Sequence, residues 1–515
     1  MKSLPSIYRE IEQLVAYGIQ AGLLEEADKV FVRNRILAVL KLDDWEDDAG
    51  ESTENADLPS ILKNILDWAA DHGLLAANTV TERDILDTEI MNCLLPRPSE
   101  VIRNFEQKYH TNPQAATEYF YHLSSASHYI REDRIKKNKQ WKTMTPYGEI
   151  DITINLSKPE KDPKEIALLK DLPSSNYPEC LLCKENEGYK GTLRHPARAT
   201  HRIIPLTLNE EGWYLQYSPY VYYKEHCIVF RDQHIPMKIS AETFSRLLDF
   251  TEQFPHYFLG SNADIPIVGG SILSHDHFQG GNYRFALEKA EEGEAVQLDG
   301  FPSVIVAPVK WPMSVIRVRG KKAEVAAVST LIYQKWQRYS DPSVGIFSET
   351  DGVPHNTVTP IARRRGDLFE IDVVLRNNRT SAEHPDGIFH PHKQLHHIKK
   401  ENIGLIEVMG LAVLPGRLES ELSRLAAYLL APPDGKENWQ EDLLKHWDWY
   451  HSILKKYPDI DADNVGKILE DEVGKIFLAV LEDAGVFKQD EQGLAAFTNF
   501  IQLVTESRDD DEQYE

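Results

Sequence analysis

The sequence has 515 residues, 42% of them hydrophobic, which is enough to build two to four domains of about 100–200 residues each. Its formal net charge of −24 excludes nonspecific binding to nucleic acid or to an anionic membrane, although a local basic pocket for an anionic metabolite is compatible with it. Four cysteines are too few for a disulfide framework, and neither a secretory leader nor an apolar run of about 18 residues is present. We therefore expect a cytoplasmic protein with no nucleic-acid or membrane partner.

The first part of the chain is predicted to be mainly helical. Ile7, Ile11 and Leu14 recur at helical spacing, and residues 62–69 continue the pattern. An acidic, polar stretch at 43–57 is typical of a solvated loop. Residues 150–156 then alternate as a strand does, and 158–164 are typical of a linker. We assign residues 1–170 to an N-terminal, mainly helical region.

The middle of the chain mixes both kinds of element. Short β-rich runs at 227–230, 303–307 and 370–375 alternate with helical segments at 241–254 and 323–339, which predicts an α+β core with an antiparallel sheet. Residues 433–508 return to a helical pattern. We place the remaining boundaries at 171–320, 321–432 and 433–515.

The most informative segment is Gly-Gly-Ser-Ile-Leu-Ser-His-Asp-His-Phe-Gln-Gly-Gly at 269–281. Side chains two apart share one face of a strand, so His275, His277 and Gln279 are expected to point the same way. Glycines let a backbone approach a ligand closely and leave N–H groups free for phosphate oxygens. The pattern favours chemistry at phosphorus over a glycine-flanked surface turn. His390-Pro-His-Lys-Gln394 repeats the His-x-His-x-Gln spacing, which fits either a duplicated unit or chance.

Cys180 and Cys183 form a C-x-x-C pair, and such a pair can supply two thiolates to one zinc ion. His234 and His275 are candidates for the other two ligands. A redox pair and two simple buried cysteines are the alternatives, but no thioredoxin-like context surrounds the motif.

His277 is the candidate nucleophile. A neutral imidazole has a reference pKa near ~6.5, so it can attack phosphorus without a separate base. Gln279 can donate its amide to a phosphoryl oxygen but cannot act as a proton donor like an imidazolium. Gln279 therefore favours transfer to a phosphate acceptor over hydrolysis.

Arginines near these motifs are candidates for phosphate contacts, because the guanidinium fork matches phosphate geometry. Arg194, Arg198 and Arg202 follow the C-x-x-C pair, and a second cluster occupies 363–365. Scattered arginines on an acidic surface are also commonly just solvated.

With these residues, the chain resembles the galactose-1-phosphate uridylyltransferases of the longer, mainly bacterial second class, within the histidine-triad superfamily. Residues 177–281 carry the most specific match, and Pro354 to Arg365 extends it through most of the chain. The resemblance implies an α+β fold. Its core would be a histidine-triad-like antiparallel half-barrel, duplicated at 171–320 and 321–432, with helical regions on both sides.

The resemblance also implies a ping-pong exchange. UDP-glucose would give its UMP to His277, releasing glucose 1-phosphate, and galactose 1-phosphate would then leave as UDP-galactose in the Leloir pathway. Gln279 would assist His277 in catalysis, and a homodimer is expected. The implied substrate contacts are Arg198, Arg202, Asn262, Gly270, Ser271, Gln279 and Glu407.

For metals, the resemblance implies a structural zinc on Cys180, Cys183, His234 and His275, and no organic cofactor. A second divalent metal would use His390 and His392, with His355 as a further candidate. The sequence departs from the first class at Asp276, where that class has proline, and nothing nearby matches a fourth ligand for the second metal.

Two other functions remain open. One is a nucleotide phosphorylase of the same superfamily, which also keeps glutamine at the third position and passes the nucleotidyl group to inorganic phosphate. The other is a non-enzymatic, zinc-stabilised binding protein, which leaves the glycine pairs and Gln279 unexplained.

Overall fold

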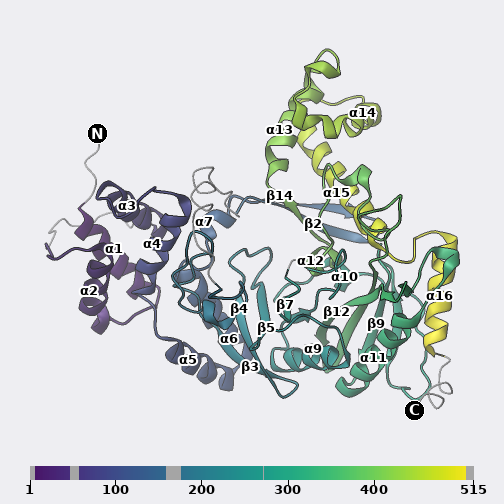
Figure 1. Ribbon diagram of the computed structural model, residues 1–515, viewed down its shortest axis with the longest axis horizontal. Helices are drawn as coiled ribbons and strands as arrows, with labels where there is room; N and C mark the ends of the chain where they lie inside the picture. Colours follow the sequence, from purple (N-terminus) through teal and green to yellow (C-terminus); the bar gives the residue numbers. More distant parts are fainter. Residues whose placement is uncertain (1–5, 47–56, 158–175, 271, 506–515) are drawn as a thin grey trace.

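The computed structural model describes residues 6–46, 57–157, 176–270 and 272–505. N-terminal helices occupy one end of the molecule, a large sheet the middle, and C-terminal helices the other end (Figure 1). The predicted linker at 158–164, Ser271 and most of the predicted acidic loop lie outside the described residues. None of the described helices combines the length and apolar content that a bilayer span needs.

The N-terminal region is helical, as predicted. Its helices are α1 (Ile7–Gln20), α2 (Lys29–Leu40), α3 (Leu58–Asp71), α4 (Val80–Asn92), α5 (Pro98–Thr111), α6 (Pro113–Ala126) and α7 (Glu132–Ile135). The stripe on α1 is fully buried at Ile11 and Leu14. Helix α4 begins with a capping box, in which the Thr79 hydroxyl accepts from the Glu82 backbone N–H and the Glu82 carboxylate accepts in return.

Within the described residues, nine strands form one antiparallel sheet in the order β3-β4-β5-β7-β6-β12-β13-β9-β8. The strands are β3 (Ile204–Leu208), β4 (Glu211–Tyr217), β5 (Cys227–Arg231), β6 (Phe258–Gly260), β7 (His277–Gly281), β8 (Ile305–Val309), β9 (Val315–Gly320), β12 (Asn356–Arg365) and β13 (Leu368–Asn377). A short hairpin of β10 (Glu349–Thr350) and β11 (Val353–Pro354) lies outside this sheet.

The order of the strands reveals the duplication. The run β4-β5-β7-β6 has the same connectivity as β8-β9-β13-β12, with one helix inserted after the second strand of each unit. The two units join edge to edge where β6 pairs with β12. The strand equivalent to β7 is therefore β13. Residues 390–394 instead lie in a loop with a single 3₁₀ turn, so their His-x-His-x-Gln spacing is not a second copy of the motif.

The inserted helices α9 (Ala241–Gln253) and α11 (Lys322–Arg338) pack on the sheet and on each other (Figure 1). Their apolar stripes include Phe244 and Leu247 on α9 and Val328 and Trp336 on α11, all fully buried. These helices match the predicted segments at 241–254 and 323–339. They cover one face of the sheet, and a cavity lined by residues of β7 is open to a ligand.

A second, three-stranded sheet joins the two ends of the chain. Strands β1 (Lys139–Thr145) and β2 (Gly148–Asn155) form a hairpin, and β14 (Leu411–Pro415) pairs with β2 in parallel. The helices after β14 are α13 (Arg417–Leu430), α14 (Trp447–Lys456), α15 (Val465–Ala484) and α16 (Glu491–Thr505). Since α15 packs on β1, the hairpin belongs in space with the C-terminal helices, although the sequence places it in the N-terminal region. Our boundaries at 170, 320 and 432 remain predictions.

Arg363, in the predicted arginine cluster at 363–365, is buried in an ion-pair network within the sheet. Arg363 donates to Glu370 and Asp372, both at 2.6 Å, and Arg317 donates to Asp372 at 2.7 Å. Burial opposes ionisation of Asp372, but the two arginines hold the pKa of its carboxyl below the ordinary value. This network ties β9, β12 and β13 together, which explains Arg363 without a ligand.

We expect Asp372→Asn to destabilise the fold by about 3–5 kcal/mol, because it leaves two buried guanidinium groups short of a charged partner. Urea denaturation followed by circular dichroism measures the change. Asp442→Asn is the matched control, since Asp442 makes an exposed ion pair with Arg424 and little change is expected. Equal effects of the two substitutions would contradict the role given to the buried network.

Candidate active site

Strand β7 places His277 and Gln279 in a cavity of about 720 Å³ on the open face of the sheet. The strand pairs with β5 and β6 on its two sides, with His277 opposite Phe230 and Gln279 opposite Ile228. The strand begins at His277, so the shared face predicted for three side chains extends to these two alone. His275 precedes the strand and turns to a separate cluster of cysteines and histidines.

The orientation of His277 is fixed by one hydrogen bond. Its Nδ1 lies 2.8 Å from the carbonyl oxygen of His275. A carbonyl only accepts, so Nδ1 carries the proton and the lone pair is on Nε2. Burial lowers the pKa of His277 to about 4, so the ring is neutral near pH 7. A neutral imidazole with a free Nε2 lone pair is a competent nucleophile.

Gln279 is held by His226, a residue that the sequence analysis did not single out. The His226 Nε2 lies 3.2 Å from Gln279 Oε1, and burial lowers the pKa of His226 to about 4. The neutral His226 ring can donate this hydrogen bond, which turns the Gln279 amide N–H group toward the cavity. His226 is two residues before Ile228, which pairs with Gln279, so its position became evident only from the strand register.

The two glycine pairs have different roles. Gly269 and Gly270 line the cavity, and a Cβ on Gly270 would lie 2.7 Å from the amide nitrogen of Asn262. Gly280 packs inside the sheet, where a Cβ would lie 2.4 Å from the Phe258 carbonyl oxygen. The N–H groups predicted to meet phosphate oxygens are therefore limited to those of Gly269 and Gly270. Nothing is described for Ser271.

The far wall of the cavity comes from residues 399–407. The Leu405 backbone N–H donates to Asn262 Oδ1 at 2.8 Å, which links this wall to the glycine loop. Glu407, on α12 (Leu405–Val408), accepts from Lys399 Nζ at 2.8 Å and from the Gly404 N–H at 3.1 Å. Both Glu407 and Lys399 line the cavity. Lys399 was missed because a lone lysine in a polar stretch carries no signal in one sequence.

The two predicted phosphate-binding arginines lie in different surroundings. Arg198 lines the cavity and donates to the Tyr129 hydroxyl at 3.5 Å. Arg202 does not line it. Its guanidinium donates to Asn92 Oδ1 at 2.8 Å and to backbone carbonyls, among them Pro96 at 3.2 Å. Arg202 therefore joins the N-terminal helices to the sheet, and we do not propose it as a phosphate contact.

Cys180, Cys183, His234 and His275 form a tight cluster beside the cavity, with their ligand atoms all within 4.8 Å of one another. The two sulfur atoms are 3.5 Å apart, and His234 Nδ1 lies 3.1 Å from Cys183 Sγ. Zn–S bonds of about 2.3 Å and Zn–N bonds of about 2.0–2.1 Å put the ligand atoms of a tetrahedral site about 3.3–3.8 Å apart, close to the 3.1 and 3.5 Å separations here. His275 Nε2 donates to the Arg231 carbonyl at 2.8 Å, so its Nδ1 lone pair is directed into the cluster. The residues fit zinc.

The three histidines expected at a second metal are not brought together. His355 binds Asn378 and Thr350, and His392 lies 3.3 Å from Asp483. His390 contacts the Pro391 carbonyl at 3.2 Å. In the part of the chain that the structure describes, the cysteine–histidine cluster is the one group of three or more such ligands within reach of a single ion. The second metal at these histidines remains a prediction.

Comparison with known proteins places the chain in one family. Family models described as galactose-1-phosphate uridyl transferase match residues 22–236 (N-terminal domain) and 250–452 (C-terminal domain). Galactose-1-phosphate uridylyltransferase of Halalkalibacterium halodurans is 56% identical over 98% of this chain and 100% of its own. The Bacillus subtilis protein of the same name is 52% identical over 96% and 97%. The chain belongs to the galactose-1-phosphate uridylyltransferase family.

Family membership makes the chain an enzyme, a nucleotidyltransferase, and the function is not that of a zinc-stabilised binding protein. Among solved structures, the yeast Ap4A phosphorylase Apa2 is similar to 62% of this chain and 90% of its own, with 13% identity and a TM-score of 0.31. A likeness this low carries no argument about function. The assignment therefore depends on the full-length relatives.

The cysteine–histidine cluster predicts about one zinc ion per chain, measurable by inductively coupled plasma mass spectrometry. Cys183→Ser is expected to lose the zinc and to lower the thermal unfolding midpoint, because it removes one of four ligands. Cys93→Ser is the control. Cys93 is equally buried but lies on the N-terminal helices, away from the cluster. The same zinc content in both variants would contradict the assigned ligand set.

Proposed function

We propose that the protein exchanges UMP between UDP-glucose and galactose 1-phosphate through a uridylyl group carried on His277. The observation that carries this proposal is the neutral, buried imidazole of His277, whose Nε2 faces a cavity large enough for a sugar nucleotide. Galactose 1-phosphate and the transferred uridylyl group follow from the names of the full-length relatives, and UDP-glucose is the uridylyl donor that the sequence resemblance implies.

In the first step, His277 Nε2 attacks the α-phosphorus of UDP-glucose. A nitrogen–phosphorus bond forms and the bond from phosphorus to the bridging oxygen breaks, so glucose 1-phosphate leaves with the electron pair. The Gln279 amide donates to a non-bridging oxygen as negative charge concentrates there. No general base is required, because His277 begins unprotonated at Nε2.

In the second step, a phosphate oxygen of galactose 1-phosphate attacks the same phosphorus and releases His277. This oxygen is already anionic, so it needs no base, and an amide at position 279 offers none to water. Arg198 and the N–H groups of Gly269 and Gly270 are the proposed phosphate contacts, and Glu407 with Asn262 the proposed contacts at the sugar end.

Zinc on Cys180, Cys183, His234 and His275 would be structural, since four protein ligands complete its shell and leave no position for substrate. It would hold the segment before β7, from which the carbonyl of His275 orients His277. The homodimer and the cytoplasmic location remain predictions.

Incubation with UDP-glucose that carries ³²P in the uridylyl phosphate tests the intermediate. We expect an acid-labile, base-stable label on the chain, located at His277 by peptide mapping and released by galactose 1-phosphate. His277→Ala should carry no label, whereas His256→Ala, a histidine change on the opposite side of the sheet, should carry it fully. Release by inorganic phosphate alone would indicate a phosphorylase instead, and an unlabelled, folded wild-type chain would exclude the covalent mechanism.

Gln279→Glu tests the amide. The two side chains have the same shape, but the carboxylate replaces an N–H donor with a negative oxygen facing the phosphoryl group. We expect the rate of His277 labelling to fall by about 100-fold or more, the usual cost of losing such a donor. The unfolding midpoint should change little. Labelling at the wild-type rate would remove Gln279 from the proposed mechanism.

A further inference from the structure

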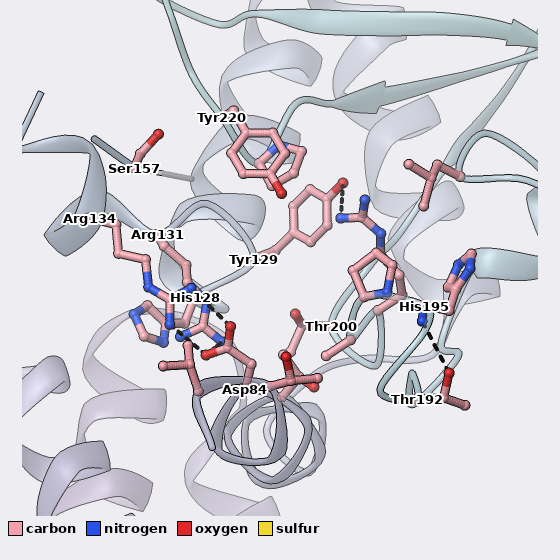
Figure 2. Close-up of a pocket in the computed structure, with 18 of the residues that line it drawn as sticks. Asp84, His128, Tyr129, Arg131, Arg134, Ser157, Thr192, His195, Thr200 and Tyr220 are labelled. Atoms are coloured by element: carbon pink, nitrogen blue, oxygen red, sulfur yellow. Dashed lines mark hydrogen bonds and ion pairs between the residues drawn. The ribbon is translucent and has the colours of Figure 1, made fainter. Parts of the chain in front are cut away.

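Arg198 and Arg376 are buried guanidinium groups next to the catalytic cavity, and in the described part of the chain neither contacts a carboxylate. Arg198 lines the cavity and donates to the Tyr129 hydroxyl at 3.5 Å (Figure 2). Arg376 lies on β13, four residues after Asp372 and therefore on the same face of the sheet. It is 1% exposed and does not line the cavity, so its contribution must pass through the residues that it contacts.

The contacts of Arg376 are neutral oxygen atoms. Its Nη2 donates to the Ile403 carbonyl at 2.9 Å and its Nη1 to the Thr359 hydroxyl at 3.3 Å, while Nε has no partner among the described residues. Burial lowers the pKa of Arg376 to about 10, which still leaves the group charged near pH 7. A buried cation without a counterion costs stability, and an apolar side chain of similar volume would fill the same space at lower cost. Stability alone therefore does not account for a guanidinium at this position.

The Ile403–Gly404 peptide connects Arg376 to the wall of the catalytic cavity. This peptide is trans and planar, so its carbonyl and its N–H point in opposite directions. The Ile403 carbonyl accepts from Arg376 on one side, and the Gly404 N–H donates to Glu407 Oε2 at 3.1 Å on the other. A cation on the carbonyl polarises the peptide and strengthens its N–H as a donor. Arg376 therefore acts on Glu407 through one peptide group.

Both carboxylate oxygens of Glu407 are held in place. Oε2 accepts from the Gly404 N–H, and Oε1 accepts from Lys399 Nζ at 2.8 Å. The charges of Arg376 and Glu407 also attract each other, which offsets part of the cost of burying the guanidinium. Glu407 is only 9% exposed, but it lines the catalytic cavity. Since each oxygen keeps a second lone pair, a carboxylate held in this way can still accept a hydrogen bond from a sugar hydroxyl.

We propose that Arg376 is a positioning residue for recognition of the hexose. Through the Ile403–Gly404 peptide it holds the Glu407 carboxylate ionised and oriented to accept from a hydroxyl of galactose 1-phosphate. This role rests on the proposed function, in which Glu407 lies at the sugar end of the cavity. Arg376 does not touch substrate, and the bond changes at His277 do not require it. Its loss therefore weakens sugar binding more than it slows uridylyl transfer.

Discharge of the ³²P-uridylylated enzyme by galactose 1-phosphate tests this role. Arg376→Met replaces the guanidinium with an apolar chain. We expect the KM for galactose 1-phosphate to rise by about 5- to 20-fold, the effect of weakening one hydrogen bond, and the maximal discharge rate to change by less than about 3-fold. Thr359→Val is the matched control, because it removes the other partner of the same guanidinium and leaves the Ile403 contact in place. It should leave the KM unchanged.

A double-mutant cycle shows whether Arg376 acts through Glu407. Glu407→Ala alone should raise the KM, and adding Arg376→Met should have no further effect, because the carboxylate on which the arginine acts is then absent. Arg376→Lys keeps the charge and one donor, so its KM should lie between those of the wild type and Arg376→Met. If circular dichroism shows that Arg376→Met does not fold, Arg376→Lys takes its place in the cycle, with an expected rise of about 2- to 5-fold.

Three results would overturn the proposal: a wild-type KM in the arginine variant, an equal rise in Thr359→Val, or effects of the Arg376 and Glu407 substitutions that simply multiply. In each of these cases the wild-type chain is still labelled by UDP-glucose, so the proposed function stands. A folded wild-type chain that takes no label removes the proposed function, and the role of Arg376 with it.

Discussion

The 2.8 Å hydrogen bond from His277 Nδ1 to the His275 carbonyl is the constraint on which the site depends. It fixes the tautomer, and therefore which nitrogen faces the cavity. The carbonyl belongs to a residue whose own ring lies in the cysteine–histidine cluster, where its Nε2 donates to Arg231. The backbone from His275 to His277 therefore sets both the geometry of the cysteine–histidine cluster and the orientation of the His277 ring. A metal there can influence the proposed reaction without touching substrate.

The duplicated sheet explains why the candidate chemistry is confined to one unit. Strand β13 occupies the position in the second unit that β7 occupies in the first, but it carries Glu370 and Asp372 where β7 carries His277 and Gln279. These carboxylates form ion pairs with Arg317 and Arg363. The face of the second unit that corresponds to the cavity face of the first therefore carries an ion-pair network in place of ligand-binding residues. Its contribution to the cavity comes instead from the loop at 399–407.

Local patterns predicted the helices and the antiparallel sheet, because each depends on nearby residues. The C-x-x-C motif also identified two members of the cysteine–histidine cluster. Local patterns failed where distant segments meet. His226 supports Gln279 through strand register, and Arg202 donates to the carbonyl of Pro96, which lies 106 positions away in the sequence. Residues 390–394 repeat the His-x-His-x-Gln spacing of residues 275–279, but they lie in a loop and not in a strand. Residues two apart point to the same side only where the backbone forms an extended strand.

The position of Arg198 gives the N-terminal helices a part in the active site. A chain with a net charge of −24 repels anionic substrates at long range, so the cationic groups that bind them must be local and held in place. Arg198 is held by Tyr129, which follows α6, and Tyr129 is anchored on β4 through the Tyr217 carbonyl. The guanidinium is therefore oriented jointly by the helical region and the sheet. The position of Arg198 in the catalytic cavity therefore depends on the packing of the N-terminal helices against β4.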